Sequence, residues 1–254
     1  GGSPHNNTNP KAKDALPRIR QLIFEGKNKE AQELCGPTIC SQSANGMPYQ
    51  TVGSLHLDFD GINEYNDYYR DLDIEKAIAT TRFTANGVTY TREAYTSFPD
   101  QVLVIRLTAS QKKSISFTAK YSTPYKSSVI RCISPRKELQ LNGKANDHEG
   151  IEGKVEFTAL TRIENNGGKL EILSDSTLQV KDANSVILYV SIGTNFVNYK
   201  DVSGDALNSA QQYLKLVNKN YPKSKASHIN AYQKYFNRVS LNLGSNTQIN
   251  KPTD

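Results

Sequence analysis

The apolar positions of this chain alternate with polar positions over many short runs, which is the period of β-strands. The pattern is clearest at Leu55-His56-Leu57-Asp58-Phe59, where the three apolar side chains share one face of an extended segment. Residues with turn chemistry separate this run from others of the same kind. We expect strands at residues 55–59, 77–84, 88–96, 101–108, 114–121, 138–141, 154–163, 169–173, 177–180 and 185–192.

The turn between the second and third of these runs is Asn86-Gly87, the strongest hairpin signal in the chain. Both central residues of a type I′ turn need a positive φ, which Asn and Gly tolerate. The run at 101–108 is apolar at nearly every position, so it predicts a strand that is covered on both faces. Other turn signals are Ser97-Phe98-Pro99-Asp100, Ser122-Thr123-Pro124, Asn142-Gly143, Asn165-Asn166-Gly167-Gly168 and Asp182-Ala183-Asn184.

Strands joined by short turns, without alternating helices, favour a sandwich over a parallel sheet. The fold we expect is mainly β, a large antiparallel β-sandwich of two large sheets. Helical spacing of apolar residues occurs only toward the ends, at 11–26, 28–35, 205–218 and 224–238. Ser224 is the expected N-cap of the last helix, and a final strand is expected at 239–243.

These elements suggest three parts. Residues 1–46 form an N-terminal loop and a helical segment packed on the sandwich, residues 47–203 form the sandwich itself, and residues 204–254 form helices and the final strand. Residues 1–10 are an irregular polar loop that looks like the middle of a longer protein.

Composition narrows the possible functions. With 254 residues and 37% hydrophobic positions, the chain is large enough to bury a proper core. The net charge of +6 comes from scattered Lys and Arg rather than from one basic face, which argues against a nucleic-acid partner. There is no apolar run of about 18 residues, so we expect no membrane insertion. Cys35 and Cys40 either close a small disulfide loop or are two buried thiols, and no cysteine spacing suggests zinc.

Several polar groups could carry chemistry, although the usual motifs of nucleotide-binding proteins, zinc proteases and serine hydrolases are absent. Asp147-His148-Glu149 is either an acid–base or metal cluster or a polar turn whose side chains bond their own backbone. Asp58 with Asp60, and Asp71 with Asp73, have the spacing of paired carboxylates on one strand face, as glycosidases need. The polar and aromatic loop 194–201 suits either stacking on a sugar ring or packing on a neighbouring domain.

Several segments, taken together and in order, resemble the N-terminal domain of glycoside hydrolase family 95, the inverting α-L-fucosidases. The resemblance covers essentially the whole chain. The segments are Met47-Pro48-Tyr49-Gln50, Gly53–Phe59, Tyr69–Asp73, Thr91–Gln101, Asp147–Gly150, Thr194–Val202 and His228–Val239.

The resemblance implies a β-super-sandwich followed by a helical linker and an (α/α)6 catalytic barrel. The helices after Asp205 correspond to the linker, and Asn250-Lys251-Pro252-Thr253-Asp254 to the point where the barrel begins. In the family, the acid Glu, the base Asp and the Asn residues that help to activate water lie in the barrel. None of them can be carried onto this chain, so the resemblance implies no catalytic residue here, no metal and no cofactor.

The resemblance also implies a partner and a location. The expected partner is the catalytic barrel of the same parent chain, and through it a fucosylated glycan, in an extracellular or periplasmic protein. The residues chosen as candidates for the rim of the sugar site are Ser3, His5, Asn6, His56 and His148.

Three functions fit this sequence. The chain is a non-catalytic domain that supports the barrel, a stand-alone carbohydrate-binding module, or a surface interaction domain. A binding module would need an exposed aromatic platform, and the absence of Trp leaves only Tyr and Phe to form it.

Overall fold

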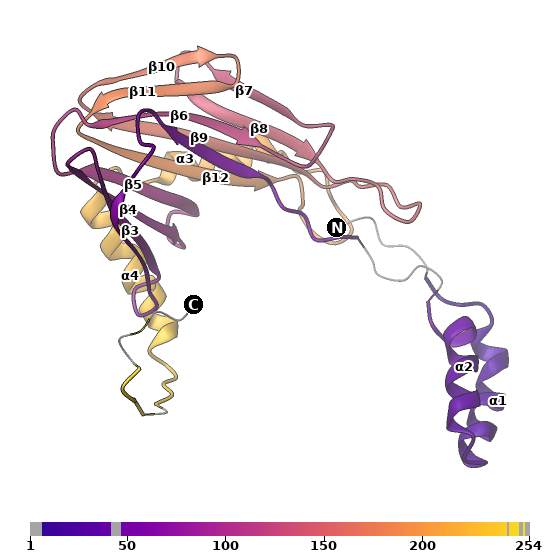
Figure 1. Ribbon diagram of the computed structural model, residues 1–254. Coiled ribbons are helices and arrows are strands. Elements are labelled where there is room, and N and C mark those ends of the chain that lie inside the picture. Colours follow the sequence, from indigo (N-terminus) through magenta and orange to yellow (C-terminus); the bar gives the residue numbers. More distant parts are fainter. Residues whose placement is uncertain (1–6, 42–46, 243, 249–250, 252–254) are drawn as a thin grey trace.

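The computed structural model describes residues 7–41, 47–242, 244–248 and 251. Within them the chain passes through two helices, a long series of strands and two more helices (Figure 1). The helices are α1 (Ala12–Phe24), α2 (Asn28–Ile39), α3 (Ala206–Leu216) and α4 (Tyr221–Phe236). The strands are β1 (Ser54–Phe59), β2 (Asn66–Asp73), β3 (Ile78–Ala85), β4 (Val88–Ser97), β5 (Val102–Ala109), β6 (Ile115–Ser122), β7 (Val129–Ile133), β8 (Glu138–Lys144), β9 (Glu156–Asn166), β10 (Lys169–Ser174), β11 (Thr177–Ala183) and β12 (Ser185–Thr194).

The described strands form two antiparallel sheets that pack face to face (Figure 1). The smaller sheet has the order β1-β6-β11-β10, and the larger has the order β2-β3-β4-β5-β12-β9-β8-β7. The prediction of a mainly β, antiparallel sandwich is confirmed. The expectation of two large sheets is wrong for one of them, because a four-stranded sheet faces an eight-stranded one. The smaller sheet therefore leaves part of the larger sheet uncovered.

The larger sheet separates two cores. Phe117 and Leu188 are fully buried between the sheets, whereas Leu214 of α3 packs in a second core on the other face of the larger sheet. The strand β5 contributes to both cores, through Leu107 on one face and Val104 on the other. The prediction that this strand is covered on both faces is confirmed. Each such large apolar side chain contributes roughly 1.5–3 kcal/mol when it is fully buried.

The turn signals had different outcomes. Asn86 and Gly87 have φ values of 51° and 73°, which confirms the predicted hairpin between β3 and β4. Asn142-Gly143, in contrast, is not a turn but part of the strand β8. A Cβ atom at Gly143 would lie 2.3 Å from the ring of Phe157 on the paired strand β9. The glycine is present because that aromatic ring lies against its backbone.

Three other predictions are corrected. The strands β2 and β7 were not predicted, and β2 has the polar sequence of an exposed sheet edge. Asn220, not Ser224, caps α4 by accepting a hydrogen bond from Lys223 N at 3.2 Å, so the helix begins earlier than expected. Residues 239–242 form no strand, and Leu243 of that predicted strand lies outside the described residues.

The helices α1 and α2 form a hairpin of their own. Their contact buries Ile19, Leu22 and Ala31, and Figure 1 shows the pair standing apart from the two sheets. The packing of this segment on the sandwich, which the three-part division includes, is therefore not seen in this structure. The division at residues 46 and 203 stays a prediction.

The three cysteines are free thiols, and Cys40 is exposed. Neither a disulfide between Cys35 and Cys40 nor a pair of buried thiols is present in this structure. No helix in the described part of the chain is both long and apolar enough to cross a membrane.

Candidate functional site

Of the residues proposed for the rim of a sugar site, the structure describes two, His56 and His148, and the proposal stays a prediction. Ser3, His5 and Asn6 lie outside the described residues. His56 lies on the exposed edge strand β1 and shares a hydrogen bond with Ser122 Oγ at 2.7 Å. His148 lies in a tight loop, where its backbone N–H and C=O both pair with Ile151 at 3.0 and 2.9 Å.

One carboxylate of each candidate group has a structural partner. Asp58 pairs with Lys120 across β1 and β6 at 2.8 Å, and the hydrogen bond from Lys120 lowers the pKa of Asp58. Asp73 accepts the backbone N–H of Lys76 at 3.0 Å and so caps the turn after β2. Asp147 accepts the backbone N–H of Gly153 at 2.9 Å. This last contact supports the polar-turn interpretation of Asp147-His148-Glu149.

The described residues contain no group of three His, Cys, Asp or Glu side chains that could hold a metal ion. The loop 194–201 is closed by backbone hydrogen bonds between Asn198 and Asp201, at 3.1 and 3.0 Å. Phe196, Val197 and Tyr199 are exposed on it. Nothing in this loop forms a pair of groups that could act as acid and base.

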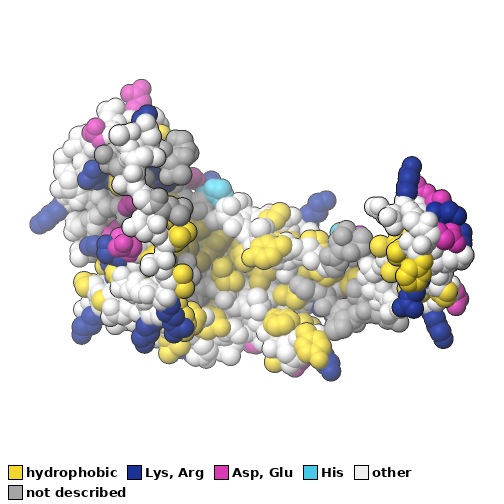
Figure 2. Space-filling model, turned by 90° about the horizontal axis from the view of Figure 1, so that it is seen from below, with side chains coloured by type: hydrophobic (Ala, Val, Ile, Leu, Met, Phe, Trp, Pro, Cys, Tyr) yellow, Lys and Arg dark blue, Asp and Glu magenta, His cyan; other side chains and the backbone are white. Residues whose placement is uncertain are grey.

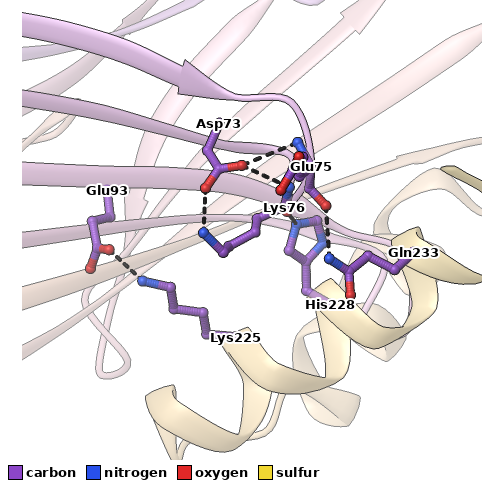
Figure 3. Close-up of polar contacts among 7 residues, drawn as sticks. All are labelled: Asp73, Glu75, Lys76, Glu93, Lys225, His228 and Gln233. Atoms are coloured by element: carbon purple, nitrogen blue, oxygen red, sulfur yellow. Dashed lines mark hydrogen bonds and ion pairs between the residues drawn. The ribbon is translucent and has the colours of Figure 1, made fainter. Parts of the chain in front are cut away.

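The most elaborate polar site lies where α4 crosses the larger sheet (Figure 3). The turn between β2 and β3 presents backbone carbonyls to the helix. His228 Nε2 lies 3.0 Å from Lys76 O, Gln233 Nε2 donates to Glu75 O at 3.1 Å, and Tyr232 Oη donates to Ile74 O at 2.8 Å. Side chains at positions 228, 232 and 233 of α4 therefore bind the carbonyls of a single turn.

A charged pair fixes the first half of α4 (Figure 3). Glu93 of β4 forms an ion pair with Lys225 and accepts a hydrogen bond from Tyr221 Oη at 3.0 Å. Arg106 of β5 lies 3.6 Å from Glu93 and covers the ring of Tyr221. Burial alone would raise the pKa of Glu93, but the hydrogen bonds from Lys225 and Tyr221, with the charges of Lys225 and Arg106, lower it. The same burial, followed by the Glu93 charge, raises the pKa of Tyr221.

A buried hydrogen-bond cluster lies under the same part of α4. Asp100 accepts hydrogen bonds from Ser97 Oγ at 2.7 Å and from Ser224 Oγ at 2.9 Å. Ser224 also lies 3.1 Å from Tyr95 Oη, and the Tyr95 ring stacks on His228 at 4.6 Å between centroids. The side chains of Asp100, Ser97, Ser224 and Tyr95 are hydrogen-bonded to one another in the buried layer, and such a network favours one orientation of the helix.

The last turn of α4 and the segment that follows it are different, because they expose apolar side chains. Tyr235, Val239 and Leu241 are 63%, 83% and 81% exposed. Figure 2 shows the molecule from below the view of Figure 1. On the face seen there, hydrophobic side chains gather over the middle of the molecule and on the α1–α2 hairpin at the right end. In short, α4 is bound to the sheet along one side, and exposed apolar side chains lie at its last turn and just after it.

Sequence reasoning predicted α4 but missed the residues that hold it. Glu93 and Lys225 lie 132 positions apart, and His228 lies 152 positions from Lys76. No local pattern links such distant residues. The available signal was the repeated aromatic residues of the helix, which indicated a packed face but not its polar partners.

Comparison with known proteins shows which family the chain belongs to. Residues 1–199 match the family model described as "Glycosyl hydrolase family 65, N-terminal domain". Alpha-L-fucosidase 2 of Arabidopsis thaliana is 31% identical over 97% of this chain, and probable alpha-fucosidase A of Aspergillus niger is 25% identical over 100% of it. The chain spans about a third of the length of each of these relatives, 32% in both cases.

Among solved structures, a putative kojibiose phosphorylase from the human microbiome is similar over 72% of this chain and 27% of its own, with 14% identity and a TM-score of 0.42. The family model covers most of the sandwich whose strands and cores are described above. The chain belongs to the family described as the N-terminal domain of glycosyl hydrolase family 65.

Proposed function

We propose that this chain is the non-catalytic N-terminal domain of an α-L-fucosidase of glycoside hydrolase family 95, and that it supports a catalytic domain in the same parent protein. The observation that carries the proposal is the two-sided character of α4. One side is bound to the sheet through Glu93, Asp100 and the β2–β3 turn, while apolar residues at its last turn and in the segment after it are exposed. A helix held in this way would fix the position of a catalytic domain that packs on its free end.

The chemistry of the described residues agrees with a supporting role. Inverting hydrolysis needs an acid and a base roughly 6.5–9.5 Å apart with a water molecule between them. Asp58 and Asp73 are tied to Lys120 and Lys76, and Asp147 is used by the backbone of its own loop. The similarity to two alpha-fucosidases over nearly the whole chain supports the choice of parent enzyme.

The supporting role has a physical basis. A displacement of catalytic groups by about 1 Å can cost about 100-fold in rate. A domain that buries apolar surface of its neighbour and fixes the linker prevents such displacements. The proposed location of the parent enzyme is extracellular or periplasmic, where fucosylated glycans are accessible.

The first experiment measures fucose release from fucosylated lactose by this chain alone and by the parent protein that contains the catalytic domain. We expect release only from the parent. Reproducible release by this chain, after contaminating enzyme has been excluded, would overturn the proposal.

The second experiment tests, within the parent protein, whether the exposed apolar residues after α4 contact the catalytic domain. Replacing Val239 and Leu241 by Ser removes exposed apolar contacts without touching the sandwich core, and should lower kcat by up to about 100-fold. The matched control is Leu173→Ser on the outer strand β10 of the smaller sheet, whose side chain is 57% exposed. Equal activity of both variants would contradict a supporting contact at the end of α4.

A further inference from the structure

The unequal size of the two sheets creates a cleft that the proposed function does not use. The smaller sheet ends at β1, and the larger sheet extends beyond it through β4, β3 and β2. A cleft of about 640 Å³ lies at this step, within the range of about 300–1,000 Å³ typical of ligand sites. The residues that line it are Leu57, Asp58, Phe59, Ile62, Tyr65, Tyr68, Arg70, Thr81, Phe83 and Arg92.

Aromatic rings form one side of the cleft. Tyr65 and Tyr68 are 57% and 54% exposed, and their ring centroids lie 5.6 Å apart. Tyr65 also meets Phe83 edge to face at 6.0 Å, which fixes its ring at the cleft wall. The Tyr65 and Tyr68 rings are tilted by 51° to each other, so they form a corner rather than one flat platform. Each exposed ring offers its own flat face on which a sugar ring can stack.

Two arginines give the cleft a positive charge. The Arg92 guanidinium lies 4.5 Å from the centroid of Phe59 and 5.2 Å from that of Phe83. Its Nε is buried and has no hydrogen-bond partner among the described residues. The single carboxylate of the lining, Asp58, is already paired with Lys120, whereas Arg70 and Arg92 have no ion pair in the described part of the chain.

A guanidinium between two rings and without an acceptor is an incomplete arrangement. A charge removed from water is costly unless an opposite charge or a set of hydrogen bonds compensates it. The planar fork of arginine matches a carboxylate, which can accept two parallel hydrogen bonds. Because Arg92 Nε is fully buried, a ligand in the cleft meets the outer end of this guanidinium, and a carboxylate is the group that best matches its charge and that of Arg70.

We propose that this cleft binds a saccharide that carries a carboxylate, such as a uronic acid unit. The sugar ring stacks on Tyr68, its edge meets the tilted ring of Tyr65, and the carboxylate pairs with Arg70 and Arg92. The site lies on the face of the larger sheet opposite to α3 and α4, so its occupancy does not depend on the proposed role of α4.

The alternation of strand residues supplies matched controls. Tyr68 and Arg70 line the cleft, whereas Tyr69 pairs with Arg82 on the opposite face, where the Arg82 guanidinium lies 5.8 Å from the Tyr69 ring. Tyr69 is 51% exposed, close to the value for Tyr68. Substitutions at neighbouring positions thus change the same chemistry either inside or outside the cleft.

The experiment titrates the whole chain with digalacturonic acid and with its neutral counterpart galactobiose, by calorimetry. We expect binding of the acidic sugar only. Tyr68→Ala removes the stacking ring and Arg70→Gln removes a charged hydrogen bond, and each should weaken the binding about 10-fold, which corresponds to about 1.4 kcal/mol. Tyr69→Ala and Arg82→Gln should leave the affinity unchanged, and circular dichroism checks that every variant is folded.

Each other result overturns the proposal. Equal binding of galactobiose would remove the role of the carboxylate. Equal weakening by Tyr69→Ala and Tyr68→Ala would place the ligand outside the cleft. No binding of digalacturonic acid at millimolar concentration would remove the site. None of these results bears on fucose release by the parent protein, so the two proposals fail independently.

Discussion

The two helical pairs of this chain are attached in opposite ways. The pair α1–α2 buries Ile19, Leu22 and Ala31 against itself and leaves Phe24 88% exposed. The pair α3–α4 is bound to the larger sheet through apolar packing and a set of buried hydrogen bonds. Helices of 13 and 12 residues are marginal on their own in water, so the first pair depends on a small core that it makes itself.

The two helical pairs differ in whether the sheet forms hydrogen bonds with them. Ser191 Oγ of β12 donates to Ala210 O at 2.9 Å, and Arg162 of β9 donates to Leu214 O at 3.1 Å. The sheet thus satisfies carbonyls of α3, and α4 in turn satisfies carbonyls of the β2–β3 turn. No comparable exchange of hydrogen bonds between α1–α2 and the sandwich occurs in the part of the chain that the structure describes. Polar contacts, rather than helix length, make the second pair part of the domain.

The largest expected effect concerns the small core of α1–α2. Leu22 is 3% exposed, and Leu22→Ala should remove about 2–5 kcal/mol from the local stability of this hairpin. Its amides should lose protection in hydrogen exchange, while those of β9 and β12 stay protected.

Gly36→Ala is the control for this variant, because the added methyl group meets no atom within 4 Å. It should stabilise α2 by about 0.5–1 kcal/mol. A loss of protection throughout the sandwich in Leu22→Ala would contradict the independence of the two parts.

The next effect concerns the contact between α3 and the sheet. A Cβ atom at Gly193 of β12 would lie 2.3 Å from Ala206 O and 2.6 Å from Ala210 N. Gly193→Ala should therefore push the helix away and cost about 1–3 kcal/mol of global stability, measured by urea unfolding. Unchanged stability would mean that α3 is not held as closely as its backbone contacts indicate.

A smaller effect is expected from the cluster under α4. Ser224→Ala removes one donor from the buried Asp100 and should cost about 1–2 kcal/mol. Ser227→Ala lies on the exposed face of the same helix and should change the stability by less than about 0.5 kcal/mol. Comparable unfolding midpoints for the two variants would show that the cluster does not fix the helix.

The smallest effect is the pH dependence from Glu93. Its pKa in the folded protein lies below the ordinary value of 4.5, because hydrogen bonds from Lys225 and Tyr221 and the nearby positive charges outweigh the effect of burial. The stabilisation is therefore present above pH 4.5 and is lost as the pH falls through the folded-state pKa.

Glu93→Gln should lower the melting temperature at neutral pH and flatten its decrease under acidic conditions. The control, Glu152→Gln, breaks an exposed ion pair with Lys144 and should leave the acid profile as it is. A profile of Glu93→Gln that matches the unmodified protein would contradict the assignment.

The sequence by itself determined the local structure and the family. Alternation at 55–59 and Asn86-Gly87 predicted strands and a hairpin correctly, because side-chain period and positive φ are properties of neighbouring residues. The ordered segments that resemble a fucosidase domain likewise needed no structure. Local patterns failed where a distant group decided, as at Gly143, whose backbone lies against Phe157.

The tertiary structure alone decided where the surfaces are. Alternation tells which side chains share a face, but not that a four-stranded sheet would end at β1, short of β4, β3 and β2, and open a cleft at Arg92. The alternation pattern also does not show that Lys225 would contact Glu93, which lies 132 positions away in the sequence. Such contacts depend on the packing of whole elements, and that packing is set by the sum of many weak interactions rather than by any single segment.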